Sequence, residues 1–302
     1  MRDSLATASA PNSIPQLQTA GKDRLAERLG GHVVAALIEE VTLAPKPGLV
    51  DIRSRGAHDD LDWNLMCTSA NALKPTFVEL AHAAIETRPM LALRERIGAI
   101  GRIGEIRMLR TTGGVNTHRG AIWTLGLLVT AAAREPTDLT PHGVASRAGS
   151  IARLPDRHAP TLTGHKGEQA CLDYDVGGAR GQAQAGFPHV VEVALPELAS
   201  SRLRGDSETA ARLNALLAVM ASLDDTCVLA RGGRSALAET QAGARRVLER
   251  GGATMLAGRR HLKALDRRLV DLNVSPGGAA DLLAAALFLD RLQNEAPQTT
   301  KP

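Results

Sequence analysis

A short apolar segment with a polar start constrains the fold of this chain most. Residues 122–133 form an Ala- and Leu-rich run that is long enough for a buried helix and too short to span a bilayer. Directly before this run, after a glycine pair, stand Asn116, Thr117, His118 and Arg119. Four consecutive hydrogen-bonding side chains are costly to bury without partners. Because a helix N-terminus has unpaired N–H groups and a positive dipole end, we predict an anion-binding corner here. A plain N-cap with a glycine turn is the simpler alternative.

The rest of the core must be built from aliphatic side chains. Hydrophobic residues make up 44% of the chain, whereas aromatic residues make up only 2%. No segment alternates with period two, and no strand–helix–strand unit or internal repeat is visible, so we predict an all-α fold with glycine-rich connecting loops. Residues 155–189 show no regular pattern. The predicted helices cover 24–43, 60–73, 75–86, 90–109, 122–133, 140–153, 207–223, 236–250, 254–272 and 279–292.

Composition also suggests the domain boundaries and the cellular setting. Residues 1–21 and 296–302 are polar and are predicted to be disordered tails around one all-helical catalytic domain, 22–295. The first segment lacks the apolar core of a secretory signal, and no segment is apolar enough for a membrane helix, so we expect a soluble, cytoplasmic protein. The net charge of +4 is spread along the chain without a basic run, which argues against nucleic acid as a partner. Three widely separated cysteines show no zinc or disulfide pattern.

An acidic cluster follows the first helix. Asp51, His58, Asp59, Asp60 and Asp62 lie within twelve residues. Carboxylates this close repel one another unless a cation lies between them, and oxygen ligands suit Mg²⁺ that bridges to phosphates. Capping of the next helix by Asp59 or Asp60 is the alternative.

Three further features suggest phosphate or cation binding. Lys46 stands between two prolines, in a stiffened loop, and is either a phosphate ligand or a solvated turn residue. Glycine turns at 177–181 and 275–278 could direct backbone N–H groups at phosphates, or could simply end helices. Asp224 and Asp225 could cap the next segment, hold a second cation, or pair with Arg231 and Arg234. None of these matches a Walker or dinucleotide-binding motif.

Several motifs in one order resemble a known family. They are Pro45–Asp51, Gly56–His58 with Asp60 and Asp62, Gly113–Ile122, Gly178–Gly181 with Gly186–Pro188, Asp225–Thr226 with Arg231–Gly232, and Asn273 with Ser275–Gly278. Over about residues 30–292 the chain resembles the triphosphoribosyl-dephospho-CoA synthases. The segments Leu223–Leu229 and Lys74–Phe77 are more similar to the malonate decarboxylase branch than to the citrate lyase branch.

The resemblance implies an all-helical transferase. ATP and 3′-dephospho-CoA would give 2′-(5″-triphosphoribosyl)-3′-dephospho-CoA and adenine. That product is the prosthetic-group precursor that a second transferase attaches to an acyl-carrier subunit. Mg²⁺ would accompany ATP. Gln182 departs from the glutamate that we expect at this position of the family.

The chemistry assigns provisional roles to the motif residues. Departure of adenine creates an oxocarbenium-like centre that needs a nearby carboxylate, and the attacking hydroxyl needs a base. We assign catalysis to Asp51, His58, Asp60, Asp62 and His118. We assign substrate and phosphate binding to Lys46, Asn116, Thr117, Arg119, Arg180, Gly181, Arg231, Gly277 and Gly278. We assign metal binding to Asp59, Asp62 and Asp225.

Two other classes of function remain open at this point. One is a Mg²⁺-dependent nucleotide hydrolase that uses the same carboxylates to activate water. The other is a non-catalytic helical module that docks an acyl-carrier subunit through its arginines.

Overall fold

The computed structural model describes residues 14–295, and all of its regular structure is helical. The predicted all-α fold is confirmed, since no strand occurs within residues 14–295. The helices are α1 Ile14–Thr42, α2 Trp63–Ala72, α3 Lys74–Glu86, α4 Met90–Thr111, α5 Arg119–Arg134, α6 Pro141–Ala152, α7 Lys166–Tyr174, α8 Gly178–Gln184, the π-helix η1 His189–Ala194, α9 Leu195–Leu203, α10 Glu208–Met220, α11 Thr226–Glu249, α12 Leu256–Asp271 and α13 Gly277–Glu295.

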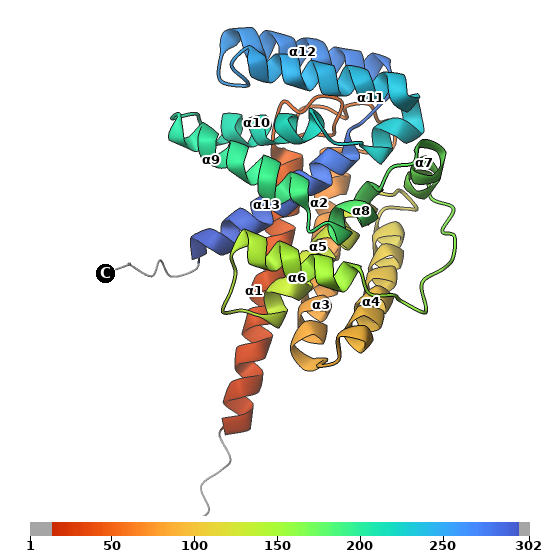
Figure 1. Cartoon of the computed structure of the whole chain (residues 1–302), viewed down its shortest axis with the longest axis vertical. Helices are drawn as coiled ribbons and strands as arrows, with labels where there is room; N and C mark the ends of the chain where they lie inside the picture. Colours follow the sequence, from red (N-terminus) through yellow and green to blue (C-terminus); the bar gives the residue numbers. More distant parts are fainter. Residues whose placement is uncertain (1–13, 296–302) are drawn as a thin grey trace, which may run out of the picture.

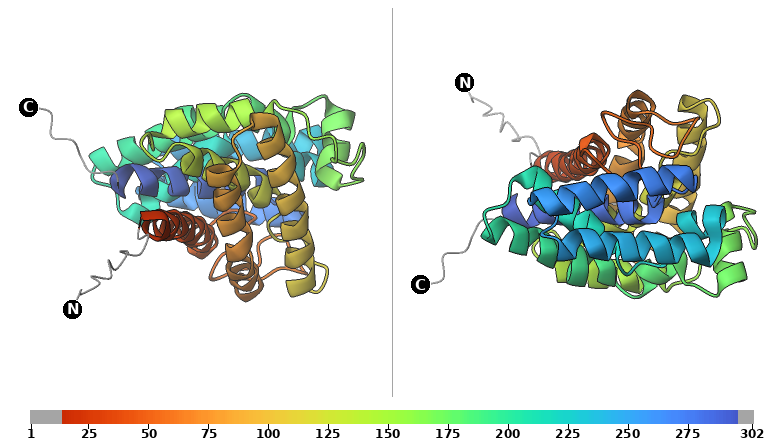
Figure 2. Two further views of the ribbon diagram at one scale, coloured as in Figure 1. Left: turned by 90° about the horizontal axis from the view of Figure 1, so that it is seen from below. Right: turned by 90° about the horizontal axis from the view of Figure 1, so that it is seen from above.

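The helices surround α5, which lies at the centre of the molecule (Figure 1). Helices α3, α6 and α13 pack against α5, and the long α1 packs against α3 and α13. Helices α11 and α12 lie side by side as an outer layer at one end (Figure 1 and Figure 2, right). From Ala121 to Ala133, every residue of α5 except Trp123 is buried, so the apolar run 122–133 is a core helix as predicted.

Glycines let α4 approach its neighbours closely. A methyl group on Gly98 would lie 2.0 Å from Oδ2 of Asp156, and one on Gly104 would lie 2.6 Å from Cγ2 of Thr76. Glycine costs about 1 kcal/mol relative to alanine inside a helix. At these two positions the cost is offset because a larger residue would push α4 away from its partners.

The predicted boundaries are close to the observed ones for most helices, with differences that have local causes. Thr140 caps α6 as expected, through the N–H of Gly143. Helices α7, α8, η1 and α9 lie in segments where we predicted none, because they are only six to nine residues long and show little helical periodicity. Helix α11 starts ten residues before the predicted helix 236–250, and Gly233 interrupts it with a φ of 64°. Helix α1 begins at Ile14, inside the segment predicted to be a tail; residues 1–13 and 296–302 lie outside the described residues.

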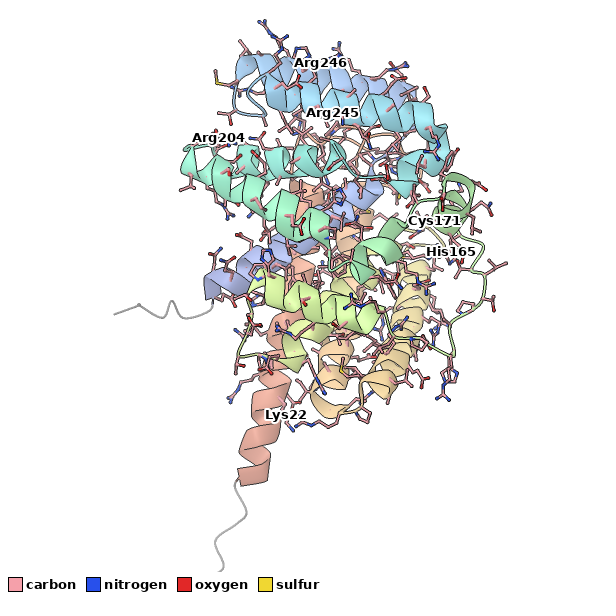
Figure 3. The ribbon with its side chains drawn as sticks, viewed as in Figure 1. Lys22, His165, Cys171, Arg204, Arg245 and Arg246 are labelled. Carbon is pink, nitrogen blue, oxygen red and sulfur yellow. The ribbon has the colours of Figure 1, made fainter. Side chains whose placement is uncertain are left out.

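The surface fits the charge pattern seen in the sequence. Lys22 on α1 lies at one end of the molecule, Arg245 and Arg246 on α11 lie at the other, and Arg204, which follows α9, lies between them (Figure 3). Within residues 14–295, no helix has both the length and the apolar character needed to cross a membrane.

Candidate active site

The loop between α1 and α2 carries the first motif and is fixed from within. The Asp51 carboxylate is buried and accepts three backbone N–H groups, from Lys46 at 3.0 Å, Arg53 at 2.7 Å and Ser54 at 2.9 Å. The N–H of Gly48 donates to Asp266 of α12 at 3.0 Å. Asp51 therefore organises the loop, and its oxygens are already occupied.

Lys46 is neither solvated nor free. Its side chain is 1% exposed, and its Nζ forms an ion pair with Glu40 of α1. Burial raises the pKa of Glu40 even though the charge of Lys46 lowers it. Glu40 was not among the predicted site residues. Its position three residues after Leu37 puts it on the apolar face of α1, which is a usable signal.

The aspartates of the acidic cluster lie in two environments: one caps a helix, and two are exposed to solvent. Oδ1 of Asp62 accepts the N–H of Leu65 at 2.9 Å and caps α2, while Oδ2 lies 3.2 Å from Arg55. Asp59 and Asp60 are exposed. Capping therefore explains Asp62, although Asp59 or Asp60 was the expected cap.

Arg231 joins this loop to α11. It donates to the carbonyl of Ala57 at 2.9 Å, and its second amino group lies 3.2 Å from Nδ1 of His58. Burial, and then the charge of Arg231, lower the pKa of His58. The neutral imidazole accepts this hydrogen bond at Nδ1, because a guanidinium can only donate.

The polar residues before α5 point in two directions. Asn116 is exposed, and its Oδ1 accepts the N–H of Arg119, whose side chain pairs with Glu105 at 3.1 Å. Thr117 lies inward, with Oγ1 2.6 Å from Oγ of Ser69 on α2. Of the four residues of the predicted anion-binding corner, Asn116 and Arg119 therefore interact on the outside, whereas Thr117 and His118 face the interior.

His118 is the inner residue of greatest chemical interest. It is 2% exposed, and its Nδ1 lies 3.0 Å from Oγ of Ser69. Its Nε2 is buried and has no hydrogen-bond partner among the described residues. Burial, and then the charge of Lys46, lower the pKa of His118 to about 4. The ring is therefore neutral at pH 7, and one of its nitrogens is unused.

Asp225 joins two helix starts. Oδ1 accepts the N–H of Cys227 at 2.8 Å, in the first turn of α11, and Oδ2 accepts the N–H of Ala279 at 2.9 Å, in the first turn of α13. A methyl group on Gly278 would lie 3.1 Å from Oδ2, so glycine allows this close approach. Gly277 lies beside Cys227 in the same way. The carboxylate serves as a double N-cap, and both helix dipoles favour its charge.

Asp281, one turn into α13, was not identified from the sequence. It is partly exposed, and no group within residues 14–295 donates a hydrogen bond to it. Burial, and then the charges of Glu40 and Asp225, raise its pKa well above the usual range. Cys227 is likewise exposed, although surrounding protein raises the pKa of its thiol. An ion pair and charge interactions link Glu40, Lys46, His118, Asp225 and Asp281, a mostly buried group of side chains that we call the polar recess.

Helix α8 borders the start of α11. A methyl group on Gly178 would lie 3.2 Å from Cγ2 of Thr226, and the carbonyl of Ala179 accepts a hydrogen bond from Trp123 of α5 at 3.2 Å. Arg180 is exposed, and Gly181 has open space around it. Gln182, at the position where we expected glutamate, has its Oε1 3.1 Å from Nδ1 of His189.

The structure does not group the three predicted metal ligands. Asp62 and Asp225 cap separate helices, and Asp59 is exposed. Among residues 14–295, no three His, Cys, Asp or Glu side chains are arranged to hold a metal ion. The carboxylates that looked like a cation site in the sequence are instead taken up mainly by backbone N–H groups.

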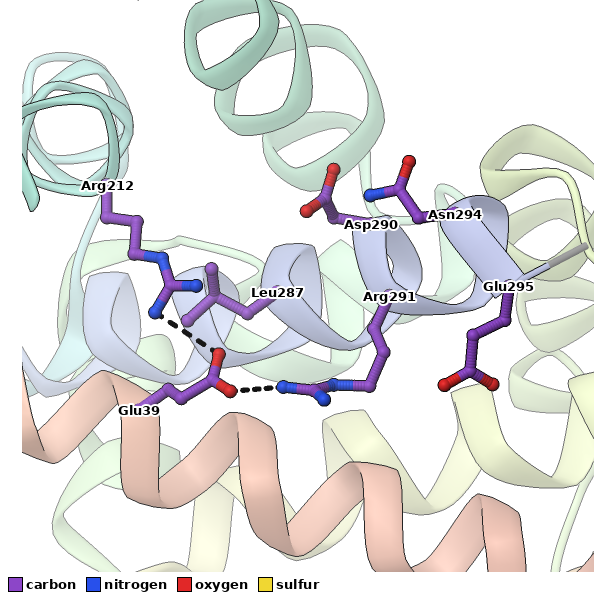
Figure 4. A pocket seen from close by; sticks show the side chains of 7 residues that line it. All are labelled: Glu39, Arg212, Leu287, Asp290, Arg291, Asn294 and Glu295. Carbon is purple, nitrogen blue, oxygen red and sulfur yellow. Dashed lines mark hydrogen bonds and ion pairs between the residues drawn. The ribbon is translucent and has the colours of Figure 1, made fainter. Parts of the chain in front are cut away.

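A separate pocket of about 230 Å³ lies between α1, α10 and α13 (Figure 4). Its charges largely neutralise one another, since Glu39 pairs with both Arg212 and Arg291. It is smaller than the roughly 300–1,000 Å³ usual for small-molecule sites, and no motif residue lines it. We therefore place the candidate site at the polar recess.

His118 is predicted to make the fold sensitive to acid over a defined range. As the pH falls from 6.5 to about 4, the unfolded chain binds a proton at this residue that the folded chain does not. At about 1.4 kcal/mol per pH unit, this difference lowers the free energy of unfolding by roughly 3 kcal/mol. The contribution of neutral His118 to stability is complete above pH 6.5 and is lost as the pH falls toward 4.

Denaturant titrations at pH 7 and pH 4 measure this effect. The parent should lose roughly 3 kcal/mol more than His118→Asn, whose amide can still bond to Ser69. His142→Asn, at an exposed position of α6, is the matched control and should behave like the parent. If the parent and His118→Asn lost equal amounts of stability between pH 7 and pH 4, the lowered pKa of His118 would be contradicted.

Comparison with known proteins agrees with the motifs. Residues 26–300 match the family described as CitG: ATP:dephospho-CoA triphosphoribosyl transferase. The chain is similar to the probable 2-(5″-triphosphoribosyl)-3′-dephosphocoenzyme-A synthase of Pseudomonas fluorescens, with 56% identity over 89% of this chain and 93% of the relative. The protein of the same description from Azotobacter vinelandii is 55% identical over 92% of this chain and 95% of its own length. No solved structure matches the chain significantly.

Proposed function

Because the chain belongs to the ATP:dephospho-CoA triphosphoribosyl transferase family and is a triphosphoribosyl-dephospho-CoA synthase, we propose that its product serves malonate decarboxylase. ATP would donate the triphosphoribosyl group to the 2′-hydroxyl of 3′-dephospho-CoA and release adenine. A second transferase would then attach the product to the acyl-carrier subunit. The similarity of Leu223–Leu229 and Lys74–Phe77 to the malonate decarboxylase branch supports this destination over citrate lyase.

One observation carries the site assignment: motifs far apart in the sequence meet in space. Asp225 holds α11 to α13, Arg231 holds α11 to the Ala57 loop, and Gly48 of that loop bonds to α12. The start of α5 packs against Asp281 at Gly120. Such convergence of polar residues on rigid helix starts supports a site for a phosphorylated substrate.

The assay of this function is direct. Purified protein with ATP, 3′-dephospho-CoA and Mg²⁺ should yield triphosphoribosyl-dephospho-CoA by mass spectrometry, with one adenine released for each product. Omission of 3′-dephospho-CoA should abolish adenine release. Adenine release from ATP alone would instead favour the hydrolase alternative.

The destination of the product needs a separate test. In cells that lack this chain, the acyl-carrier subunit of malonate decarboxylase should have the mass of the unmodified polypeptide. A modified malonate decarboxylase carrier in those cells, beside an unmodified citrate lyase carrier, would contradict the proposed branch.

We propose further that Mg²⁺ enters as the complex with ATP and not as a resident ion. Mg²⁺ commonly binds through substrate phosphates and only one or two carboxylates. The occupied oxygens of Asp51, Asp62 and Asp225 support this reading. Chelator should therefore stop turnover, whereas calorimetric titration of MgCl₂ into the protein without ATP should give no saturable binding. Tight binding of Mg²⁺ to the free protein would contradict this proposal.

A further inference from the structure

Asp281 is a carboxylate with no structural task in the described chain. It lies one turn into α13, against the start of α5, where a methyl group on Gly120 would come within 2.0 Å of its Oδ2. Every other carboxylate of the polar recess is engaged: Glu40 pairs with Lys46, and Asp225 caps two helices. Asp281 is accessible to solvent and accepts no hydrogen bond from residues 14–295.

Two buried polar atoms at the neighbouring starts of α5 and α13 also lack partners among the described residues. Nε2 of His118 belongs to the N-cap residue of α5, two residues before Gly120, and Oγ of Ser275 belongs to the segment that leads into α13. Both residues are at least 97% buried, His118 at 2% and Ser275 at 3% exposure. Buried polar atoms are normally paired, so two such atoms at neighbouring helix starts indicate a polar ligand.

The charges around Asp281 increase its affinity for a proton. Glu40 from α1 and Asp225 from α11 are the like charges near it, and together with burial they raise its pKa. The ionisable groups near these residues also include Lys46, which pairs with Glu40, the neutral His118, and the Cys227 thiol, whose pKa is raised by burial and then by the charges of Asp225 and Asp281. A carboxylate that is surrounded by protein, lies near two like charges and has no hydrogen-bond partner destabilises the fold. Such a residue is typical of a catalytic position.

We propose that Asp281 is a catalytic residue that accepts the proton of the 2′-hydroxyl of 3′-dephospho-CoA during transfer. This inference rests on the proposed function. The hydroxyl oxygen forms a bond to C1′ of the ATP ribose, and the C1′–N9 bond breaks with its electron pair remaining on adenine. Adenine takes up a proton from water, and Asp281 returns the hydroxyl proton to water. Its negative charge also favours the oxocarbenium-like centre at C1′.

The first test replaces the carboxylate with an amide of the same shape. Asp281→Asn should lower kcat roughly 100- to 10,000-fold, the range for removal of a general base, with a much smaller change in KM for ATP. The variant should melt at or above the temperature of the parent, because the substitution removes a buried like charge. Asp271→Asn, an exposed carboxylate at the end of α12, is the matched control and should retain parental turnover.

A second variant tests the chemical role itself. Asp281→Ala should be inactive, and added formate should restore part of its turnover by supplying a small carboxylate. The proposal is overturned if the parent forms product and Asp281→Asn turns over within about twofold of it. It is also overturned if Asp281→Ala is inactive and formate restores nothing. Absence of product from the parent would instead overturn the proposed function, and this inference with it.

Discussion

Lys46→Met should lower the free energy of unfolding by roughly 3–5 kcal/mol, the usual cost of leaving a buried charge without its partner. The side chains of Lys46 and Glu40 are only 1% and 6% exposed, so water cannot replace the lost ammonium group. Methionine fills a similar volume, so the change in the free energy of unfolding reports mainly the loss of the positive charge. Because the pKa of Glu40 is already raised, the cost should grow as the pH rises through that pKa and the carboxylate ionises.

The double variant Lys46→Met with Glu40→Leu is the decisive control. Replacement of both partners by apolar groups removes the uncompensated charge, so most of the lost stability should return. Denaturant titrations of the parent, both single variants and the double variant give the coupling energy of the pair. A Lys46→Met variant as stable as the parent at pH 8 would show that Glu40 is neutral or solvated.

The fold was predictable because the helical signals are local. The apolar run that became α5, the Thr140–Pro141 start of α6 and the periodicity of α4 each depend on residues within one or two turns. The short helices α7, α8 and α9 were missed because their stability comes from packing against distant segments, as when Gly178 of α8 contacts Thr226 of α11. The helix propensity of a short segment does not reflect such contacts.

The site was harder to predict because polar residues have two possible uses. Asp51, Asp62 and Asp225 were chosen as catalytic or metal-binding groups, and each accepts backbone N–H groups at a loop or helix start. Sequence spacing does not separate a cap from a ligand, since both favour Asp near a helix N-terminus. Asp281 was missed for the opposite reason: an acid with no other charged residue within eight positions of it belongs to no local motif, and its neighbours Glu40 and Gly120 are far away in the sequence.

Gly120→Ala should reduce turnover about as much as Asp281→Asn, roughly 100-fold or more, although it changes no charge. Its added methyl group would lie 2.0 Å from Oδ2 of Asp281, which no real contact permits. The carboxylate is the end of a short side chain and can rotate away, so the fold should survive while the catalytic oxygen is displaced. Gly101→Ala in α4, where the nearest atom to an added methyl is 4.0 Å away, is the matched control and should be active.

The combination of Gly120→Ala with Asp281→Asn distinguishes displacement of Asp281 from a general disturbance of α5. If Gly120→Ala acts only through Asp281, the double variant should turn over no more slowly than Asp281→Asn alone, because the two changes remove the same group. If the two losses multiply, Gly120→Ala disturbs something else, such as the neutral His118 two residues before it. Steady-state kinetics and thermal unfolding of all four proteins decide between these outcomes, and a Gly120→Ala variant with parental kcat would place the reacting ribose away from Asp281.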